Sequence, residues 1–256
     1  MIVVRNKFFA AMKVLAWLLM LDASLLSGVA QAGVVISGTR VIYAAQEREV
    51  TVKLDNEGTV PALVQVWLDT GNPNAMPDET PVPFTLSPPL FRLDPKKGQS
   101  LRLIYTQEPL PQDKESLYWL NVLEVPPRAT ATPDDPNSLQ LAFRSRIKLF
   151  FRPTGLKGDP RDAPAQVTWS IVPGKAGNEL KAENPGAYHI TFSAIDAVVG
   201  GVTYHDDKGG MVDPQSSMSF ALHGLPASSA APLKVIYHYI DDYGAALDGT
   251  FLLNAR

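Results

Sequence analysis

Short runs in which apolar and polar residues alternate recur along this chain after its first thirty or so residues. Examples are EVTVKL at 49–54, ALVQVWLD at 62–69 and LYWLNVLEV at 117–125. Turn-forming residues rich in Pro, Gly, Asn and Asp separate the runs. A strand turns successive side chains to opposite faces, so this alternation indicates half-buried strands. Strands at such spacing predict an all-β protein built as a sandwich.

A break in the pattern divides the chain. The segment RPTGLKGDP at 152–160 contains two prolines and two glycines, which indicates a linker. Strand-like runs start again after it, at 166–172, 179–184, 188–199, 217–222 and 233–240. We therefore expect two β domains, at 33–154 and 155–256.

Residues 1–32 have the features of a secretory signal peptide. Three basic residues precede an apolar run at 14–21, and Ala30-Gln31-Ala32 fits a small-x-small cleavage site. A membrane anchor is the alternative, but the apolar run is short for a bilayer and Asp22 ends it. We expect export, cleavage after Ala32 and no membrane insertion of the mature protein.

Composition argues against several classes of function. The formal net charge is −3, which argues against a nucleic-acid partner because such proteins tend to be basic. The chain has no cysteine, which rules out disulfides, thiol catalysis and cysteine-based zinc sites.

The histidines give no reason to propose an enzyme. His189 and His238 lie in strand-like runs and are interpreted as strand-face residues. His205-Asp206-Asp207 has atoms suited to a metal, but Lys208-Gly209-Gly210 follows and favours a hairpin turn. No HExxH, GxSxG or Walker motif occurs. We expect no catalytic activity, no metal and no cofactor.

The run LQLAFRSRIKLFFRP at 139–153 combines an apolar face with a cationic one. Taken by itself, it predicts a half-buried strand whose basic residues are solvated. Lys148, late in this run, and Arg40, in the first strand after the signal peptide, could instead form a site for an anion. Both residue types bind carboxylates through charge-assisted hydrogen bonds.

Taken in order, these segments resemble the periplasmic pilus-assembly chaperones of the PapD-like type. The matching segments are SGTRVIY (37–43), SPPLFRLDPKKGQSLRLIYT (87–106), LPQDKESLYWLNVLEVPP (110–127), NSLQLAFRSRIKLFFRP (137–153), ENPGAYHITF (183–192) and YIDDYGA (239–245). The resemblance covers essentially the whole chain after residue 32. It implies two immunoglobulin-like β-sandwich domains joined at an angle, with a cleft between them.

The resemblance also implies residue roles. Arg40 and Lys148 would bind the C-terminal carboxylate of a fimbrial or pilus subunit in the cleft. The donor strand, which would complete the unfinished sandwich of that subunit, would present Leu139, Leu141, Phe143 and Ile147. An interdomain salt-bridge network would join Glu115, Arg152 and Asp242, although the adjacent Asp241 could exchange roles with Asp242.

The function implied is ATP-independent. The chaperone would stabilise subunits in the periplasm by donor-strand complementation and deliver them to an outer-membrane usher. A bare donor strand also invites self-capping homodimers.

Two other functions stay open at this point. One is a secreted two-domain adhesion or carbohydrate-binding module, in which the apolar face of 139–151 is ordinary core. The other is a hydrolase built from scattered Asp, His and Ser residues. Exposure of Leu139, Leu141 and Phe143 would favour the chaperone, because soluble proteins seldom expose such a run. Lys148 shares its parity with Arg144, not with the apolar residues, so we expect a twist or bulge, or a lysine stem that reaches around the cleft.

Overall fold

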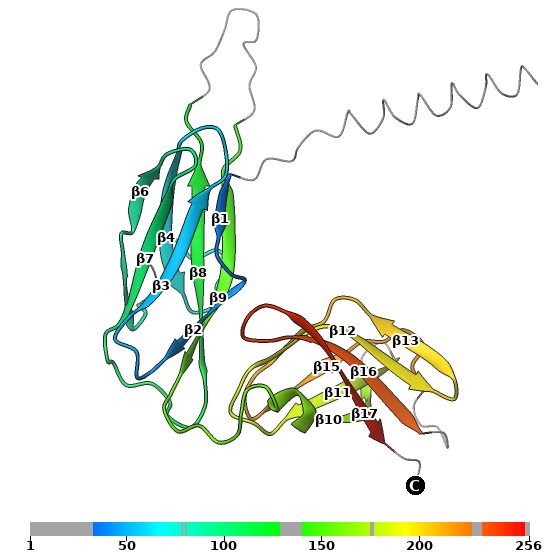
Figure 1. Cartoon of the computed structure of the whole chain (residues 1–256). Coiled ribbons are helices and arrows are strands. Elements are labelled where there is room, and N and C mark those ends of the chain that lie inside the picture. The colour runs from blue at the N-terminus through cyan, green and yellow to red at the C-terminus, as the bar shows by residue number, and fades with distance from the viewer. Residues whose placement is uncertain are drawn as a thin grey trace, which may run out of the picture. The chain divides into compact units, whose positions relative to one another are not determined.

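The first part of the chain folds into two β-sheets that share one core (Figure 1). A computed structural model describes residues 33–77, 79, 81–128, 140–174, 177–226 and 232–253. One sheet has the order β1 (Val34–Ile36), β3 (Val50–Asn56), β7 (Gly98–Tyr105), β5 (Phe84–Ser87). The other has the order β2 (Arg40–Ala44), β9 (Phe143–Arg152), β8 (Ser116–Val125), β4 (Ala62–Asp69), β6 (Leu90–Leu93).

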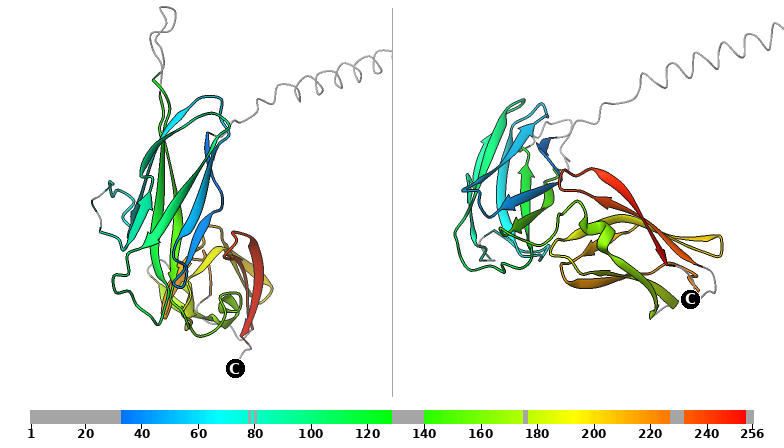
Figure 2. Two further views of the ribbon diagram at one scale, coloured as in Figure 1. Left: turned by 60° about the vertical axis from the view of Figure 1, so that its left-hand side comes forward. Right: turned by 60° about the horizontal axis from the view of Figure 1, so that its bottom comes forward.

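Alternate residues of these strands fill the first core, as the sequence pattern predicts. Leu54, Leu101 and Leu120 are fully buried and come from β3, β7 and β8. Aromatic rings add to this core at one end, where Tyr43 packs against Phe151 with ring centroids 6.0 Å apart. The views in Figure 2 show β8 and β9, in green, running side by side along this sandwich.

Alternation over 34–43 predicts a single first strand that carries Arg40, but the structure has two strands there. The run splits into β1, which pairs antiparallel with β3, and β2, which pairs parallel with β9 in the other sheet. Gly38 lies between them with a φ of +107°, a conformation that glycine adopts without the steric penalty of a Cβ atom. This change of sheet at residues 37–39 places Arg40 beside β9.

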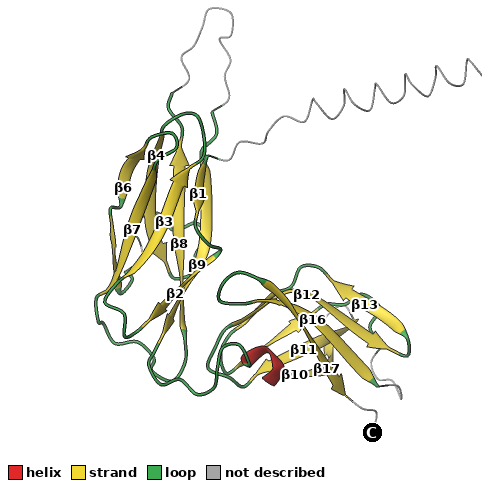
Figure 3. Ribbon diagram, viewed as in Figure 1, coloured by secondary structure: helices red, strands yellow, loops and turns green. Residues whose placement is uncertain are grey.

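The second part of the chain forms another pair of sheets with its own core. One sheet has the order β10 (Thr168–Gly174), β11 (Gly177–Asn184), β15 (Ser216–Phe220). The other has the order β13 (Val202–Asp206), β12 (Ile190–Val199), β16 (Leu233–Ile240), β17 (Ala246–Leu253), and β14 (Gly210–Val212) also pairs with β12. A short 3-10 helix, η1 (Ala163–Gln166), precedes them (Figure 3).

The all-β class with two sandwiches is therefore confirmed. The alternation did not reveal the short strands β5 and β6, the strands β13 and β14, or β17. Three to five residues give too little period to recognise, and Gly249 interrupts the pattern of β17.

Candidate functional site

Strand β9 has an open edge along its first half. On one side it pairs with β8 from Phe143 to Phe151, whereas β2 pairs with its other side only from Lys148 to Arg152. Among the strands that the structure describes, none pairs with the second edge between Phe143 and Ile147. This half of β9 therefore presents unpaired backbone groups, which attract an added strand.

The apolar residues of this edge are exposed. Phe143 exposes 62% of its surface and Leu141 exposes 53%. Ile147 is half-buried and packs against the first core, so it belongs partly to the sandwich itself. Leu139 lies outside the described residues. Two of the four residues predicted for the donor strand thus remain uncovered in this chain.

Arg40 and Lys148 lie directly beside each other where the open edge ends. They are register partners in the parallel pairing of β2 with β9. The Nη1 of Arg40 donates to the backbone oxygen of Ile240 at 3.0 Å, and the Nζ of Lys148 donates to Oγ1 of Thr191 at 3.1 Å. Thr191 and Ile240 are themselves partners in the pairing of β12 with β16. A single pair of strand partners in the second sandwich, Thr191 and Ile240, therefore contacts both cations of the first sandwich.

The parity of Lys148 needs no bulge. The pairing of β8 with β9 runs without a register shift, and Leu149 and Phe151 of β9 point into the first core. Phe143 shares their face, so it lies on the core side of the sheet, where the sandwich is open. Lys148 points to the opposite face, which the second domain contacts through Thr191. The expected bulge is therefore absent from the described strand, and the apolar stripe and the cation lie on opposite faces of β9.

The cations lie close together in a partly buried place. Burial and, to a smaller extent, the nearby charge of Arg40 lower the pKa of Lys148 to about 8, while Asp213 acts in the opposite direction. Burial also lowers the pKa of Arg40, partly offset by Asp242 and Asp241. The Nε of Arg40 is buried and has no hydrogen-bond partner among the described residues. An anion placed here would relieve both the repulsion and the missing hydrogen bond.

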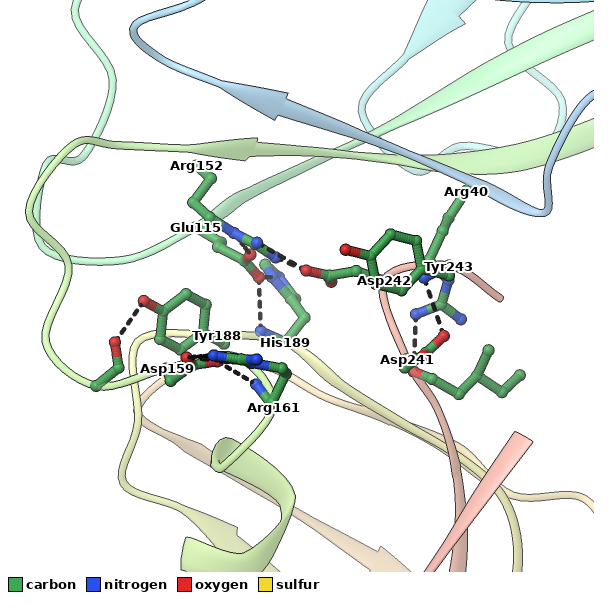
Figure 4. Close-up of polar contacts among 12 residues, drawn as sticks. Arg40, Glu115, Arg152, Asp159, Arg161, Tyr188, His189, Asp241, Asp242 and Tyr243 are labelled. Atoms are coloured by element: carbon green, nitrogen blue, oxygen red, sulfur yellow. Dashed lines mark hydrogen bonds and ion pairs between the residues drawn. The ribbon is translucent and has the colours of Figure 1, made fainter. Parts of the chain in front are cut away.

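The structure brings Glu115, Arg152 and Asp242 together in one network (Figure 4). The guanidinium of Arg152 donates to Glu115 at 2.8 Å and to both carboxylate oxygens of Asp242 at 2.7 and 3.0 Å. Burial alone would lower the pKa of Arg152, but the hydrogen bonds with Asp242 and the charge of Glu115 raise it overall. Glu115 belongs to the first sandwich and Asp242 to the second, so the network joins the two.

Asp241 and Asp242 do not exchange roles. Oδ1 of Asp241 accepts hydrogen bonds from the backbone N–H groups of Tyr243 and Ala245 at 2.9 and 2.8 Å. This holds the turn between β16 and β17 in shape, while Asp242 points towards Arg152 (Figure 4). The alternative left open by the sequence is thereby resolved in favour of Asp242.

His189 belongs to the same network, which sequence reasoning missed. Its backbone N–H donates to Oε2 of Glu115 at 2.8 Å, and its Nδ1 lies 3.1 Å from the same oxygen. The ring packs against Phe150, with centroids 5.2 Å apart. His189 precedes β12 and is nearly buried, so the interpretation as an ordinary strand-face residue was wrong.

A cavity of about 490 Å³ adjoins this network. Its lining includes both charged and aromatic groups, among them Arg40, Glu115, Arg152, Asp159, Arg161 and Tyr243. Arg40 thus faces the cavity and also lies beside Lys148, whereas Lys148 is not part of the lining.

A second polar cluster braces the outer face of β9. Asp69 at the end of β4 is fully buried and accepts from Arg146 at 2.5 Å and from Asn121 at 2.8 Å. Burial would raise the pKa of Asp69, but these hydrogen bonds outweigh it and lower the pKa. Arg144 donates to Asn121 at 2.7 Å and to the backbone oxygen of Pro73 at 2.7 Å.

Two tryptophans complete the cluster. The guanidinium of Arg146 lies 4.1 Å from the ring centre of Trp119, and that of Arg144 lies 4.6 Å from the ring of Trp67. The basic face of β9 is therefore bound to β4 and β8 instead of being merely solvated. The sequence feature that points to this cluster is the placement of Arg144 and Arg146 on one face of the same strand, where a carboxylate of a neighbouring strand can pair with them.

Two further histidines each pair with one aspartate. His205 lies 2.6 Å from Asp196, and His238 lies 2.5 Å from Asp248. The turn predicted after His205 lies between β13 and β14. Within the described ranges, no group of three or more His, Asp or Glu residues is arranged to hold a metal ion. Within the same ranges, no helix has the length and apolar character needed to cross a membrane.

Comparison with known proteins identifies the family. Residues 33–157 match the family described as "Pili and flagellar-assembly chaperone, PapD N-terminal domain", and residues 162–251 match "Pili assembly chaperone PapD, C-terminal domain". The chain belongs to the PapD-like pilus-assembly chaperones. The resemblance drawn from the sequence segments is thereby confirmed.

Individual relatives agree with this membership of the PapD-like chaperones. The chain is 45% identical over 227 residues to the probable fimbrial chaperone YadV of Escherichia coli K12, covering 88% of this chain and 90% of YadV. The crystal structure of YadV has a TM-score of 0.73 at 43% identity, covering 87% and 100% of the two chains. The Salmonella enterica SafB chaperone, solved in complex with the SafA pilin, has a TM-score of 0.70 at 28% identity, covering 88% and 99%. PapD-like proteins are chaperones and not a known class of enzyme.

Proposed function

We propose that this PapD-like chaperone binds fimbrial or pilus subunits by supplying β9 as their missing strand. The observation that carries the proposal is the open edge of β9 at 143–147, with Phe143 and Leu141 exposed beside it. Backbone pairing along the edge would give affinity, and the exposed apolar side chains would fill the groove of an incomplete subunit. SafB, a chaperone of similar structure, was solved in complex with the SafA pilin, which is an association of the kind proposed here.

The edge itself favours the C-terminus of the subunit. A strand added along 143–147 meets β2 at Arg40, because β2 already pairs with β9 from Lys148 onwards. The added chain must therefore end or turn away at the two cations. A terminal carboxylate is a chain end that two positive groups attract, so the added strand would run towards Lys148, parallel to β9. Anchoring this end would fix the register of the added strand.

The electrostatics of the cleft support the same ligand. Arg40 and Lys148 repel each other, and the buried Nε of Arg40 lacks an acceptor among the described residues. A carboxylate supplies the compensating charge and the acceptor. The cluster of Asp69, Arg144 and Arg146 would keep β9 in place on its paired side while its other edge accepts the subunit.

Further parts of the proposal rest on the sequence and the family. We place the protein in the periplasm, after cleavage behind Ala32, with its two domains dividing at 154 and 155. We propose that it acts without ATP or catalysis and passes its subunits to an outer-membrane usher. In the absence of a subunit, the open edge could pair with that of a second copy to form a homodimer.

An adhesion or carbohydrate-binding module fits less well. That interpretation requires the apolar stripe of β9 to be ordinary core, whereas Leu141 and Phe143 are more than half exposed. Family membership likewise favours the chaperone.

The test is co-expression in a bacterial periplasm with candidate pilus subunits. Wild type should keep its own subunits soluble and co-purify with them, whereas Arg40→Ala and Lys148→Ala should lose the subunit and remain folded. Lys234→Ala, which removes an exposed lysine on β16, is the matched control and should behave as wild type. Subunit recovery at wild-type yield with both cleft variants would refute the assignment.

A further inference from the structure

The turn between β16 and β17, residues 240–245 and here called the hairpin tip, contacts the first sandwich at three points. The backbone oxygen of Ile240 accepts from Arg40, and the carboxylate of Asp242 binds Arg152. The third contact involves Gly244, which lies against Thr39. The three contacts span both strands that carry the cationic pair, because Arg40 begins β2 and Arg152 ends β9.

The contact of Gly244 with Thr39 leaves no room for a side chain. A Cβ atom at this position would overlap with Oγ1 of Thr39, and the backbone has a φ of +84°. Glycine is therefore required both for the conformation and for the space. Thr39 directly precedes Arg40, so any displacement of the hairpin tip from Thr39 acts next to the guanidinium.

Hydrogen bonds within the hairpin tip tie its residues to one another. Asp241 braces it by accepting from two backbone N–H groups, and the backbone N–H of Gly244 donates to the oxygen of Asp241 at 3.1 Å. A shift at Gly244 is therefore transmitted to Ile240, whose oxygen orients Arg40. The buried Nε of Arg40 leaves this guanidinium with few other hydrogen bonds to fix its direction.

We infer that Gly244 is a positioning residue for carboxylate binding: it lets the hairpin tip close on Thr39 and thereby orients Arg40 towards the subunit terminus. The inference rests on the proposed function, since it assumes that Arg40 receives a carboxylate. It assigns a role in subunit recognition to a residue of the second domain that need not touch the subunit.

The test compares two peptides that carry the C-terminal strand of a co-purifying subunit, one with a free carboxylate and one amidated. Affinities are measured by isothermal titration for wild type, Gly244→Ala and Gly201→Ala. Gly201 has a φ of +82° with nothing within 4 Å of a Cβ atom, so its variant carries the same backbone strain without the overlap. We expect Gly244→Ala to weaken the free-carboxylate peptide about tenfold or more, the loss of one charged hydrogen bond, and to leave the amidated peptide unchanged.

A rescue distinguishes positioning from general damage. Thr39→Ala removes the overlapping oxygen, so the double variant Gly244→Ala/Thr39→Ala should recover most of the preference for the free carboxylate. If Gly244→Ala does not fold, Thr39→Leu crowds the same contact from the other side and should show the same selective loss.

The outcomes separate the inference from the proposed function. Equal binding of both peptides by wild type would refute the proposed function. A wild type that prefers the free carboxylate, with Gly244→Ala keeping that preference or Gly201→Ala losing it equally, would refute the inference. If the double variant Gly244→Ala/Thr39→Ala binds the free-carboxylate peptide no better than Gly244→Ala alone, the inference is also refuted.

Discussion

Replacing Phe143 of β9 and Leu141, two residues before it, by alanine should weaken subunit binding while leaving the free chaperone stable. Phe143 exposes 62% of its surface and Leu141 exposes 53%. Full burial of such a side chain stabilises by about 1.5–3 kcal/mol, so burying the exposed fractions gives about 1–2 kcal/mol each. The double variant should therefore lose about 2–3.5 kcal/mol, which corresponds to about 30- to 300-fold in affinity.

The assay is redistribution of a subunit between two chaperones. A purified complex of wild type with its subunit is mixed with an equal amount of the tagged, subunit-free variant. At equilibrium, with little free subunit present, the ratio of the two dissociation constants equals the square of the ratio of the two complexes, because each chaperone that loses the subunit is released in free form. Equilibrium unfolding in urea, measured in parallel, reports the stability of each free chaperone.

A matched control comes from the second domain. Leu252 and Leu253 of β17 expose 64% and 47%, so replacing both by alanine removes a comparable apolar surface elsewhere. This control should leave the redistribution unchanged. The reasoning fails if the β9 variant holds the subunit as well as wild type does. It also fails if the variant's unfolding free energy falls by several kcal/mol, because that would place the stripe in the chaperone's own core.

Three further predictions concern charged groups. Affinity for a free-carboxylate subunit should be constant below about pH 8 and fall above it, because Lys148 loses its proton with a pKa of about 8; titrations across this range should show no such fall for Lys148→Arg, and a flat wild-type profile would count against the lysine. Asp69→Ala should lower the unfolding free energy by about 3–5 kcal/mol in urea, because it leaves Arg146 half-buried without its partner. Since the pKa of Asp69 is lowered from 3.8, this difference should be complete above that pH and shrink below it, and an equal difference at pH 2 would contradict the linkage. Arg152→Ala should also lower the unfolding free energy by about 3–5 kcal/mol in the same assay, because it leaves the charge of Glu115, which is only 4% exposed, without its partner. The double variant Arg152→Met/Glu115→Gln should recover part of this loss. Absence of any recovery would argue against an uncompensated charge as the cause.

Much of the architecture followed from local pattern. Alternation predicted β4 and β16 with the bounds that the structure gives, and it placed β8 and β11 within two residues. Alternation predicted these strands because one face of each is buried and the other is not, so apolar and polar residues repeat with a period of two. It failed at 34–43, where two strands of different sheets follow each other with only Ser37-Gly38-Thr39 between them, a break too short to interrupt the apparent alternation.

The site was predictable only in part. The residues Arg40, Lys148, Glu115, Arg152 and Asp242 came from the family resemblance, and the structure places them in two adjoining groups. Asp69, His189 and Thr191 were missed. Each contacts a partner more than forty residues away, and no local spacing reports such a contact.

By itself, the sequence determined that this chain forms strands, that it has no cysteine, and that the strand ending at Arg152 carries an apolar face and a basic one. Parity along a strand is a local property, so it can be taken from the order of residues. Only the tertiary structure decided which edge of β9 stays open, that Lys148 faces the second domain, and that Asp242 rather than Asp241 binds Arg152. Those outcomes depend on pairings such as Arg40 with Ile240, which lie 200 residues apart, and these are fixed by packing of the whole chain.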